Sequence, residues 1–307
     1  MHVHAVDGTY ELFRAYFGAP EAKTPSGQEI GAVRVLARSM LRLVRVEGAT
    51  HIGIAFDHTV ESFRNDLFDG YKSGEGLEPE LDEQFHPAEE ICKALGFVVW
   101  PMVEFEADDA MATAAARYGA DPQVESVRLC TPDKDLAQCV QGERIVTVDR
   151  RRNLVFDETG VRAKFGIEPA SMPDYLALVG DPADGIPGIP RWGAKSASVV
   201  LAEYKHVEAI PDDPEVWSVK VRGAVKLAAN LAGMREEAAL YRELATLRTD
   251  APLTESVADL RWRGPDFERL QRVCEELGDR SLVERARSIP VPGTQSPLKP
   301  DSGPRRH

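Results

Sequence analysis

The sequence predicts an α/β fold in which a mostly parallel central sheet is flanked by helices. Two observations carry this prediction. Short apolar runs alternate with stretches of helical spacing over roughly residues 1–180, which is the pattern of strands joined by helical crossovers. Acidic residues recur directly after these runs, at the edge of a parallel sheet where functional crevices form.

Each element follows from its local pattern. The strand candidates are short β-rich runs at 2–7, 51–56, 97–102, 126–131 and 144–149. Apolar residues at helical spacing lie between them, at 29–46, 83–95, 107–118 and 134–140. Beyond about residue 170 the pattern becomes helical, with one helix over 223–247 and a last helix near 265–287.

The segment 58–82 interrupts this alternation. Its sequence, HTVESFRNDLFDGYKSGEGLEPELD, is polar, mixed in charge and contains glycine. It follows a strand that ends in Asp57, at the edge where the acids gather. We therefore expect it to project over the crevice at the strand ends.

Composition limits the classes of protein that fit. The 307 residues suffice for one large domain or two smaller ones, and 43% apolar with 28% charged residues is ordinary for a globular protein. No apolar run reaches the roughly 18 residues of a membrane span, and MHVHAVDG is too short and too soon acidic for a signal peptide. The four cysteines form no CxxC pair, which indicates small buried side chains in a reducing cytosol.

Nine acidic residues fall at or near one edge of the predicted sheet. They are Asp7, Asp57, Glu106, Asp108, Asp109, Asp133, Asp135, Asp181 and Asp184. Any one of them could be a helix-dipole partner, a cap or a turn residue. Together they would repel one another unless cations lay between them.

Carboxylate oxygens are the ligands that Mg²⁺ and Mn²⁺ prefer. Two such ions, roughly 3.5–4 Å apart, can activate a water and stabilise the leaving oxygen of a phosphodiester. The net charge of −13 argues mildly against a protein that binds nucleic acid over its whole surface. That argument weakens if much of the charge is concentrated in one metal-binding crevice.

Five separated motifs resemble those of the 5′–3′ exonuclease and flap endonuclease family, which includes the N-terminal nuclease domain of bacterial DNA polymerase I. The motifs are VDGTYELFRAYF (6–17), AFDHTVESFRNDLFDGYK (55–72), FEADDAMAT (105–113), CTPDKDLAQCV (130–140) and YLALVGDPADGIPGIPRWGAKSA (175–197). Their order and spacing agree with the family, and the likeness covers roughly residues 1–288. The chain ends where a polymerase domain would begin, so the resemblance implies a stand-alone nuclease.

The resemblance also implies a domain organisation. Residues 1–170 would form a PIN-like α/β nuclease domain with a helical arch at about 58–86. Residues 171–288 would form a helical subdomain that grips DNA through a helix-3-turn-helix motif, and 289–307 a disordered tail.

Residue roles follow from the same resemblance. The nine acids would bind two Mg²⁺ or Mn²⁺ ions, directly or through water, while Lys72 and Arg14 would act on the reacting phosphate. Arg64 would contact the 5′ strand from the arch. The duplex would be gripped by a loop whose carbonyls hold a K⁺ ion and whose matching residues are Gly188, Gly193, Lys195 and Ser196. Arg191 of the same loop does not match the motif but would add a phosphate contact if its φ is not positive. Without the motifs, a solvated lysine or arginine would be the simpler interpretation of the basic positions.

Three features depart from the family pattern. The run after Lys72 is acidic, with Glu75, Glu78, Glu80, Asp82 and Glu83, and should weaken binding of long single-stranded flaps by repulsion. Arg191 stands where glycine is common, so a positive φ there would be strained. Trp192 is unusual beside the loop and is expected to pack under it.

The expected function is metal-dependent hydrolysis of DNA phosphodiesters at or near 5′ ends by a two-metal-ion mechanism. Nicked, gapped or flapped duplexes would be substrates, with RNA–DNA hybrids included, in DNA replication and repair. We expect a cytoplasmic monomer with no membrane partner. Two alternatives remain: a structure-specific DNA-binding protein with weak or no cleavage, and a PIN-type ribonuclease.

Overall fold

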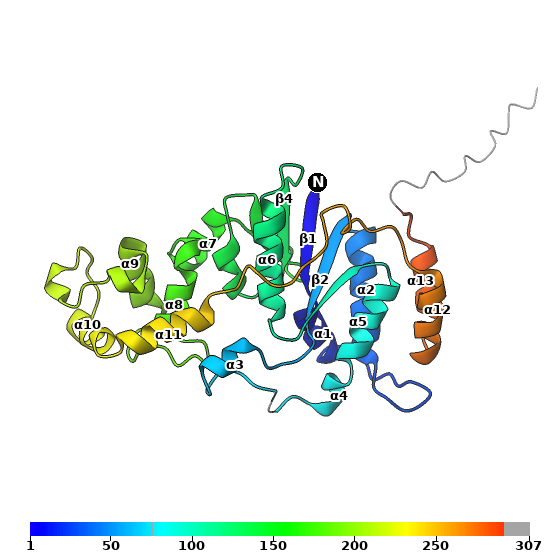
Figure 1. Cartoon of the computed structure of the whole chain (residues 1–307), viewed down its shortest axis with the longest axis horizontal. Helices are drawn as coiled ribbons and strands as arrows, with labels where there is room; N and C mark the ends of the chain where they lie inside the picture. The colour runs from blue at the N-terminus through cyan, green and yellow to red at the C-terminus, as the bar shows by residue number, and fades with distance from the viewer. Residues whose placement is uncertain (75, 292–307) are drawn as a thin grey trace, which may run out of the picture.

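The fold is described for residues 1–74 and 76–291 of a computed structural model (Figure 1). Glu75 of the acidic run and residues 292–307 of the expected tail lie outside this range. None of the helices in the described part of the chain has the length and apolar character needed to cross a bilayer.

A six-stranded sheet forms the centre, in the order β3-β2-β1-β4-β5-β6. The first five strands in the chain pair in parallel, and β6 pairs antiparallel to β5 at one edge. Their bounds are β1 His2–Asp7, β2 His51–Asp57, β3 Val98–Met102, β4 Ser126–Cys130, β5 Ile145–Asp149 and β6 Leu154–Phe156. The predicted α/β class and mostly parallel sheet are confirmed, and the three-residue β6 is an addition.

Helices surround the sheet and continue beyond it. The α-helices are α1 Gly8–Tyr16, α2 Gly31–Arg45, α3 Phe63–Leu67, α4 Pro79–Asp82, α5 Phe85–Ala94, α6 Ala107–Gly119, α7 Glu158–Phe165, α8 Met172–Val179, α9 Ala194–Tyr204, α10 Ala224–Ala232, α11 Arg235–Ala245, α12 Phe267–Glu276 and α13 Ser281–Arg287. The 3₁₀ helices are η1 Asp135–Cys139, η2 Pro169–Ser171, η3 Val207–Ala209 and η4 Pro214–Val216.

Alternation along the strands divides the core into layers. Val6 points to the face covered by α1, α2 and α5, whereas Val3 and Ala5 point to the face covered by α6. The helices from α7 to α11 pack around a third core that includes Trp192 and extends to one side of the sheet (Figure 1). The carboxyl ends of the parallel strands point toward the side of the molecule where α3 and α4 lie (Figure 1).

Three predicted helices differ from those observed. The helix expected over 223–247 is divided into α10 and α11 around Gly233. The last helix is divided into α12 and α13, because Gly278 takes a left-handed φ of 64° directly after the C-cap residue of α12. The segment 134–140 forms the tighter 3₁₀ helix η1.

Two expectations about the loop before α9 can be compared with its conformation. Trp192 is 5% exposed and its Nε1 donates to the Leu227 carbonyl at 3.1 Å, so its predicted packing under the loop is confirmed. Arg191 has a φ of 71°, a conformation that side chains with a Cβ rarely adopt. The arginine at this position is therefore strained.

Candidate metal centre

Asp7 and Asp57 end neighbouring strands, and each is fixed by the start of a helix. Asp7 Oδ1 accepts the Tyr10 amide of α1 at 2.8 Å, and Oδ2 accepts the Thr131 hydroxyl at 2.9 Å. Asp57 Oδ1 accepts the Ala107 amide at the start of α6 at 2.7 Å. Parallel pairing aligns the two strand ends, so both carboxylates lie at one edge of the sheet.

Glu106 precedes α6 and its carboxylate is held from the segment after β2. Oε1 accepts the Ser62 hydroxyl at 2.7 Å, and Oε2 lies 3.0 Å from the Lys72 ammonium and 3.3 Å from the Tyr71 hydroxyl. Lys72 Nζ is also 3.0 Å from Asp184 Oδ1. Lys72 therefore links Glu106 to a carboxylate that lies far away in the sequence.

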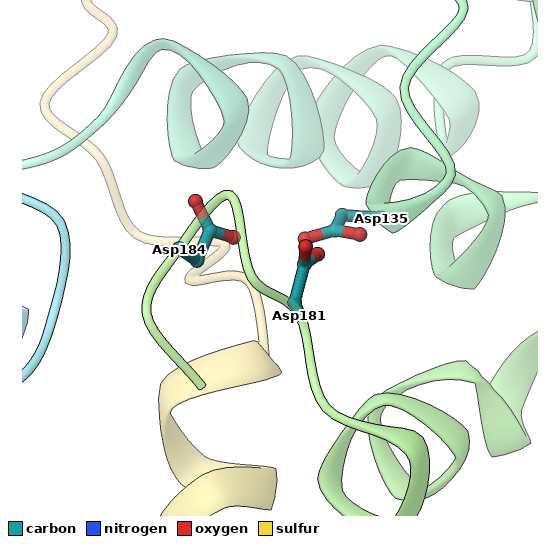
Figure 2. A group of neighbouring side chains, drawn as sticks. All are labelled: Asp135, Asp181 and Asp184. Atoms are coloured by element: carbon teal, nitrogen blue, oxygen red, sulfur yellow. The ribbon is translucent and has the colours of Figure 1, made fainter. Parts of the chain in front are cut away.

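A second group of carboxylates forms where η1 meets the loop after α8. Asp135, Asp181 and Asp184 each offer an oxygen within 4.8 Å of the others. Figure 2 shows the three side chains facing one another from the two segments. The turn that places Asp135 is fixed locally, because its amide donates to Asp133 Oδ1 at 2.8 Å.

The second group has the chemistry of a cation site. Asp135 is 6% exposed, and its Oδ1 is buried without a hydrogen-bond partner, although Lys134 Nζ lies 3.4 Å away. The same ammonium contacts Asp181. A buried carboxylate oxygen with free lone pairs, beside two further carboxylates, fits a hard divalent cation.

Burial and, after it, mutual repulsion both oppose ionisation of these carboxyl groups when no cation is bound. Burial, reinforced by Asp57 and Asp133, raises the pKa of Asp7 to about 7. Burial and then the charge of Asp133 raise the pKa of Asp108 and of Asp135 well above the usual range. Bound cations would reverse these shifts by favouring the ionised carboxylates.

Glu106 behaves in the opposite way. Burial alone would raise the pKa of its carboxyl, but the charges of Lys72 and Arg64 outweigh burial and lower it. Burial would lower the pKa of Lys72, but Glu106, Tyr71, Asp184 and Asp57 outweigh burial and raise it well above its usual value. Glu106 and Lys72 are therefore an ionised pair at the rim of the carboxylate cluster.

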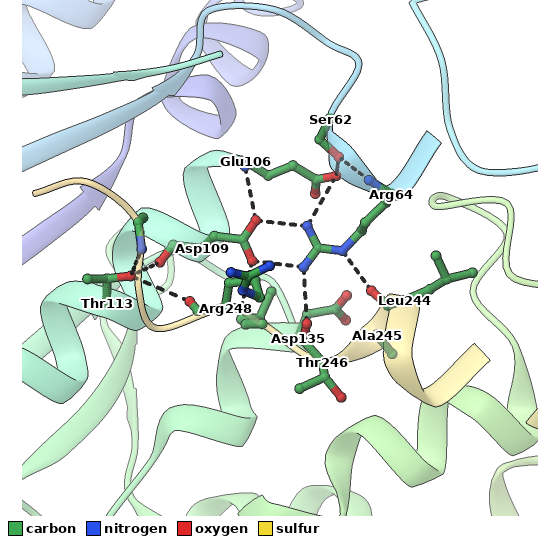
Figure 3. A network of polar contacts seen from close by, with 12 residues as sticks. Ser62, Arg64, Glu106, Asp109, Thr113, Asp135, Leu244, Ala245, Thr246 and Arg248 are labelled. Carbon is green, nitrogen blue, oxygen red and sulfur yellow. Dashed lines mark hydrogen bonds and ion pairs between the residues drawn. The ribbon is translucent and has the colours of Figure 1, made fainter. Parts of the chain in front are cut away.

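Two predicted roles do not fit the geometry, and we correct both. Asp109 is fully buried, and its two oxygens accept both Arg64 guanidinium nitrogens at 2.8 Å and the amides of Glu106 and Arg248 (Figure 3). Its lone pairs are occupied, which leaves none directed at a metal. Arg64 is only 1% exposed and so is not placed to contact DNA.

The other predicted basic residues lie at two places. Arg14 donates to Glu11 and, at 3.4 Å, to the Ser39 hydroxyl, so its guanidinium is turned onto α1 and α2. Arg191 and Lys195 are exposed where the loop enters α9.

The remaining loop residues shape that turn. Gly188 has a φ of 73°, and a Cβ there would lie 2.5 Å from the Gly180 nitrogen. The Ser196 hydroxyl closes the turn by donating to the Gly193 carbonyl at 3.0 Å. These contacts define the loop, and the DNA contacts of its residues stay a prediction.

Lys134 is the residue at the centre that the sequence reasoning missed. It stands between Asp133 and Asp135 in TPDKD, and this cation among acids was the available signal. Ser62 and Tyr71, which bind Glu106, were also missed, because nothing in the local sequence connects them with a residue some 40 positions away.

Comparison with known sequences supports one family over most of the chain. The model described as "5'-3' exonuclease, N-terminal resolvase-like domain" matches residues 2–166, and "5'-3' exonuclease, C-terminal SAM fold" matches residues 167–268. A 5′-3′ exonuclease of Aquifex aeolicus is 30% identical, with 94% of this chain and 96% of the relative covered. DNA polymerase I of Bacillus caldotenax is 32% identical over 95% of this chain, which spans 33% of that relative.

Solved structures agree on the fold. The zinc-bound 5′-exonuclease of T5 matches with a TM-score of 0.63 at 18% identity, covering 93% of this chain and 97% of that one. The catalytic core of Rad2 in complex with DNA matches with a TM-score of 0.60 at 15% identity, covering 92% and 91%. These identities establish the fold alone. Since models of one family match both parts and a relative is matched over nearly its whole length, the chain belongs to the 5′–3′ exonuclease family.

Proposed function

We propose that this protein is a divalent-metal-dependent 5′–3′ exonuclease and 5′ flap endonuclease that hydrolyses DNA phosphodiesters at or near 5′ ends. One observation carries the proposal. Asp135, Asp181 and Asp184 meet within 4.8 Å, and a buried oxygen of Asp135 has no hydrogen-bond partner. Family membership supports the same reading, because the Aquifex relative of nearly equal length is a 5′-3′ exonuclease.

The residues fit two sites for Mg²⁺ or Mn²⁺. Asp135, Asp181 and Asp184 would hold one ion. The second ion would be held by the acids around Asp7, whose charges act on one another. They are Asp7, Asp57, Asp108 and Asp133, with Glu106 at the rim. Such ions, when bound, activate water and stabilise the leaving oxygen of a phosphodiester.

Lys72 supplies the positive charge next to these acids. Its ammonium lies between Glu106 and Asp184, its side chain is 29% exposed, and its raised pKa keeps it protonated. A fixed cation at this place would stabilise negative charge that develops on the reacting phosphate. Arg14 would help from α1, after turning away from Glu11.

The duplex behind the cut would be held by the loop before α9. Arg191 and Lys195 are exposed there and can meet phosphates, while Gly188, Gly193 and Ser196 set the shape of the turn. A K⁺ ion on the loop carbonyls would assist. The partners would be nicked, gapped or flapped duplexes and RNA–DNA hybrids, bound by a cytoplasmic monomer.

The test compares cleavage of 5′-labelled flap DNA, nicked duplex and single-stranded RNA, with and without Mg²⁺. Asp133→Asn and Asp135→Asn should abolish cutting of DNA while DNA binding is retained. Asp259→Asn is the matched control, because this exposed aspartate lies beside the amino end of β2, opposite the carboxylates. Unchanged cutting in the first two variants would refute the metal assignment.

The alternatives give different results in the same assay. Binding of flaps by the wild-type protein without any cleavage would indicate a structure-specific DNA-binding protein. Cleavage restricted to single-stranded RNA would indicate a PIN-type ribonuclease.

A further inference from the structure

Arg64 and Asp109 form a buried ion pair with the geometry of a fork. Arg64 Nη1 donates to Asp109 Oδ2 and Nη2 donates to Oδ1, each at 2.8 Å. The arginine is 1% exposed and the aspartate fully buried. Two parallel charged hydrogen bonds fix both the distance and the relative orientation of the two side chains.

The pair joins three segments that are distant in sequence. Arg64 belongs to α3 and Asp109 to α6, and the third segment is the last turn of α11 with the residues that follow it (Figure 3). Arg64 Nε donates to the Leu244 carbonyl at 2.8 Å, and Nη2 donates to the Thr246 carbonyl at 3.1 Å. Asp109 Oδ1 accepts the Arg248 amide at 2.8 Å. The end of α11 is thereby tied to the sheet domain.

The pair also determines where Glu106 lies. Asp109 Oδ2 accepts the Glu106 amide at 3.0 Å, and Arg64 Nη1 is 3.5 Å from Glu106 Oε1. The same oxygen accepts the hydroxyl of Ser62, the residue that caps α3. Both the backbone and the carboxylate of Glu106 are therefore held by groups attached to the pair.

A second path leads from the pair to Lys72. Asn65, next to Arg64 in α3, donates from its side-chain nitrogen to the Lys72 carbonyl at 2.9 Å. Its side-chain oxygen accepts the Ser62 amide at 2.9 Å, which fixes the asparagine in turn. Movement of Arg64 would thus shift Lys72 relative to Glu106, across an ion pair only 3.0 Å long.

We propose that Arg64 and Asp109 are positioning residues that hold Glu106 and Lys72 in register, and that neither contacts DNA or metal. The inference rests on the proposed function of the carboxylate site. Buried ion pairs contribute little net stability compared with apolar residues of similar volume, so fixed geometry is the better explanation for this pair. Lysine cannot replace the arginine, because an ammonium lacks the planar fork.

The test uses two variants that separate geometry from contact. R64K keeps the charge and loses the fork. R64Q/D109N removes both charges and leaves no unpaired buried carboxylate. The same measurements can therefore be made on this variant if R64K folds poorly. R263K is the matched control for the first variant, because Arg263 is exposed and remote from the pair.

Three quantities are measured: Mn²⁺ affinity by calorimetry, kcat and KM on a nicked duplex, and the salt dependence of DNA binding. Residues that orient metal ligands are worth about 10–100-fold in affinity or activity, so R64K and R64Q/D109N should lose that much in Mn²⁺ affinity and in kcat. Their KM should change little, and R263K should match the wild type.

Salt dependence decides whether Arg64 contacts phosphate. The slope of log K against log salt is negative, and loss of one phosphate contact makes it shallower by about 0.9. We expect an unchanged slope for R64Q/D109N and a reduced slope for Lys195→Gln, which removes a proposed contact. A reduced slope in R64Q/D109N, or wild-type Mn²⁺ affinity and kcat in R64K, would overturn the inference. Calorimetry and slopes need no cleavage, so a wild-type protein that does not cut would refute the proposed function alone.

Discussion

Asp7 makes the metal-free protein sensitive to pH. Burial and the neighbouring carboxylates raise its pKa from 3.8 to about 7. A carboxyl whose pKa is higher in the folded state contributes stability that is fully present below the unfolded pKa and is lost as pH rises through the folded pKa. The shift is about 3 units, and at about 1.36 kcal/mol per unit the loss is ~4 kcal/mol between about pH 4 and pH 7.

The assay is urea unfolding in EDTA at several pH values across that range. Other carboxyls titrate as well, so the informative quantity is the difference between the wild type and Asp7→Asn. As pH rises, the free energy of unfolding of the wild type should fall by ~4 kcal/mol relative to that of Asp7→Asn, because asparagine cannot ionise. Mg²⁺ should restore wild-type stability at high pH, since metal ligands bind deprotonated. Parallel pH profiles for the two proteins in EDTA would refute the reasoning.

Three further predictions concern the backbone and the acidic run. Arg191→Gly should raise the free energy of unfolding by up to about 1 kcal/mol, because φ is 71°. The same variant should make the negative slope of log K against log salt for DNA binding shallower by about 0.9, as titrations at several salt concentrations would show. Glu80→Lys should tighten binding of long single-stranded flaps and leave nicked duplex unchanged, as filter binding would show; equal effects on both would contradict the repulsion argument. Gly185→Ala should reduce thermal stability and kcat, because its Cβ would lie 2.1 Å from a backbone oxygen of the segment that carries Lys72. Gly223→Ala is its control, with a φ of 78° and nothing within 4 Å, and an equal loss in both would assign the effect to φ alone.

The sheet could be predicted because its signals are local. Five strands are apolar runs of ordinary length, and their order along the chain fits parallel pairing. The division of two long helices was harder to predict, because a helix tolerates an isolated glycine such as Gly233 or Gly278 at a modest cost in stability. A three-residue edge strand such as β6 carries too short a pattern to be recognised.

The centre could be predicted only where a strand end fixes the side chain. Asp7 and Asp57 were placed correctly at the edge by this argument. In the run EADD the acids look equivalent in sequence, yet Asp109 bends back to the Glu106 amide and to an arginine 45 positions away. Its role depends on a contact between distant segments, which one sequence does not reveal.

The second carboxylate group is assembled across a boundary in the chain. Asp135 lies within the first matched region, 2–166, whereas Asp181 and Asp184 lie within the second, 167–268. A chimera that received the second region from a relative would exchange part of the candidate metal centre together with the loop before α9, which we propose contacts the duplex. The chimera would keep the carboxylate group only if the acids of the exchanged region lie as close to Asp135 as Asp181 and Asp184 do. Changes to the proposed DNA contacts of the second region are therefore constrained by the need to keep Asp181 and Asp184 beside Asp135.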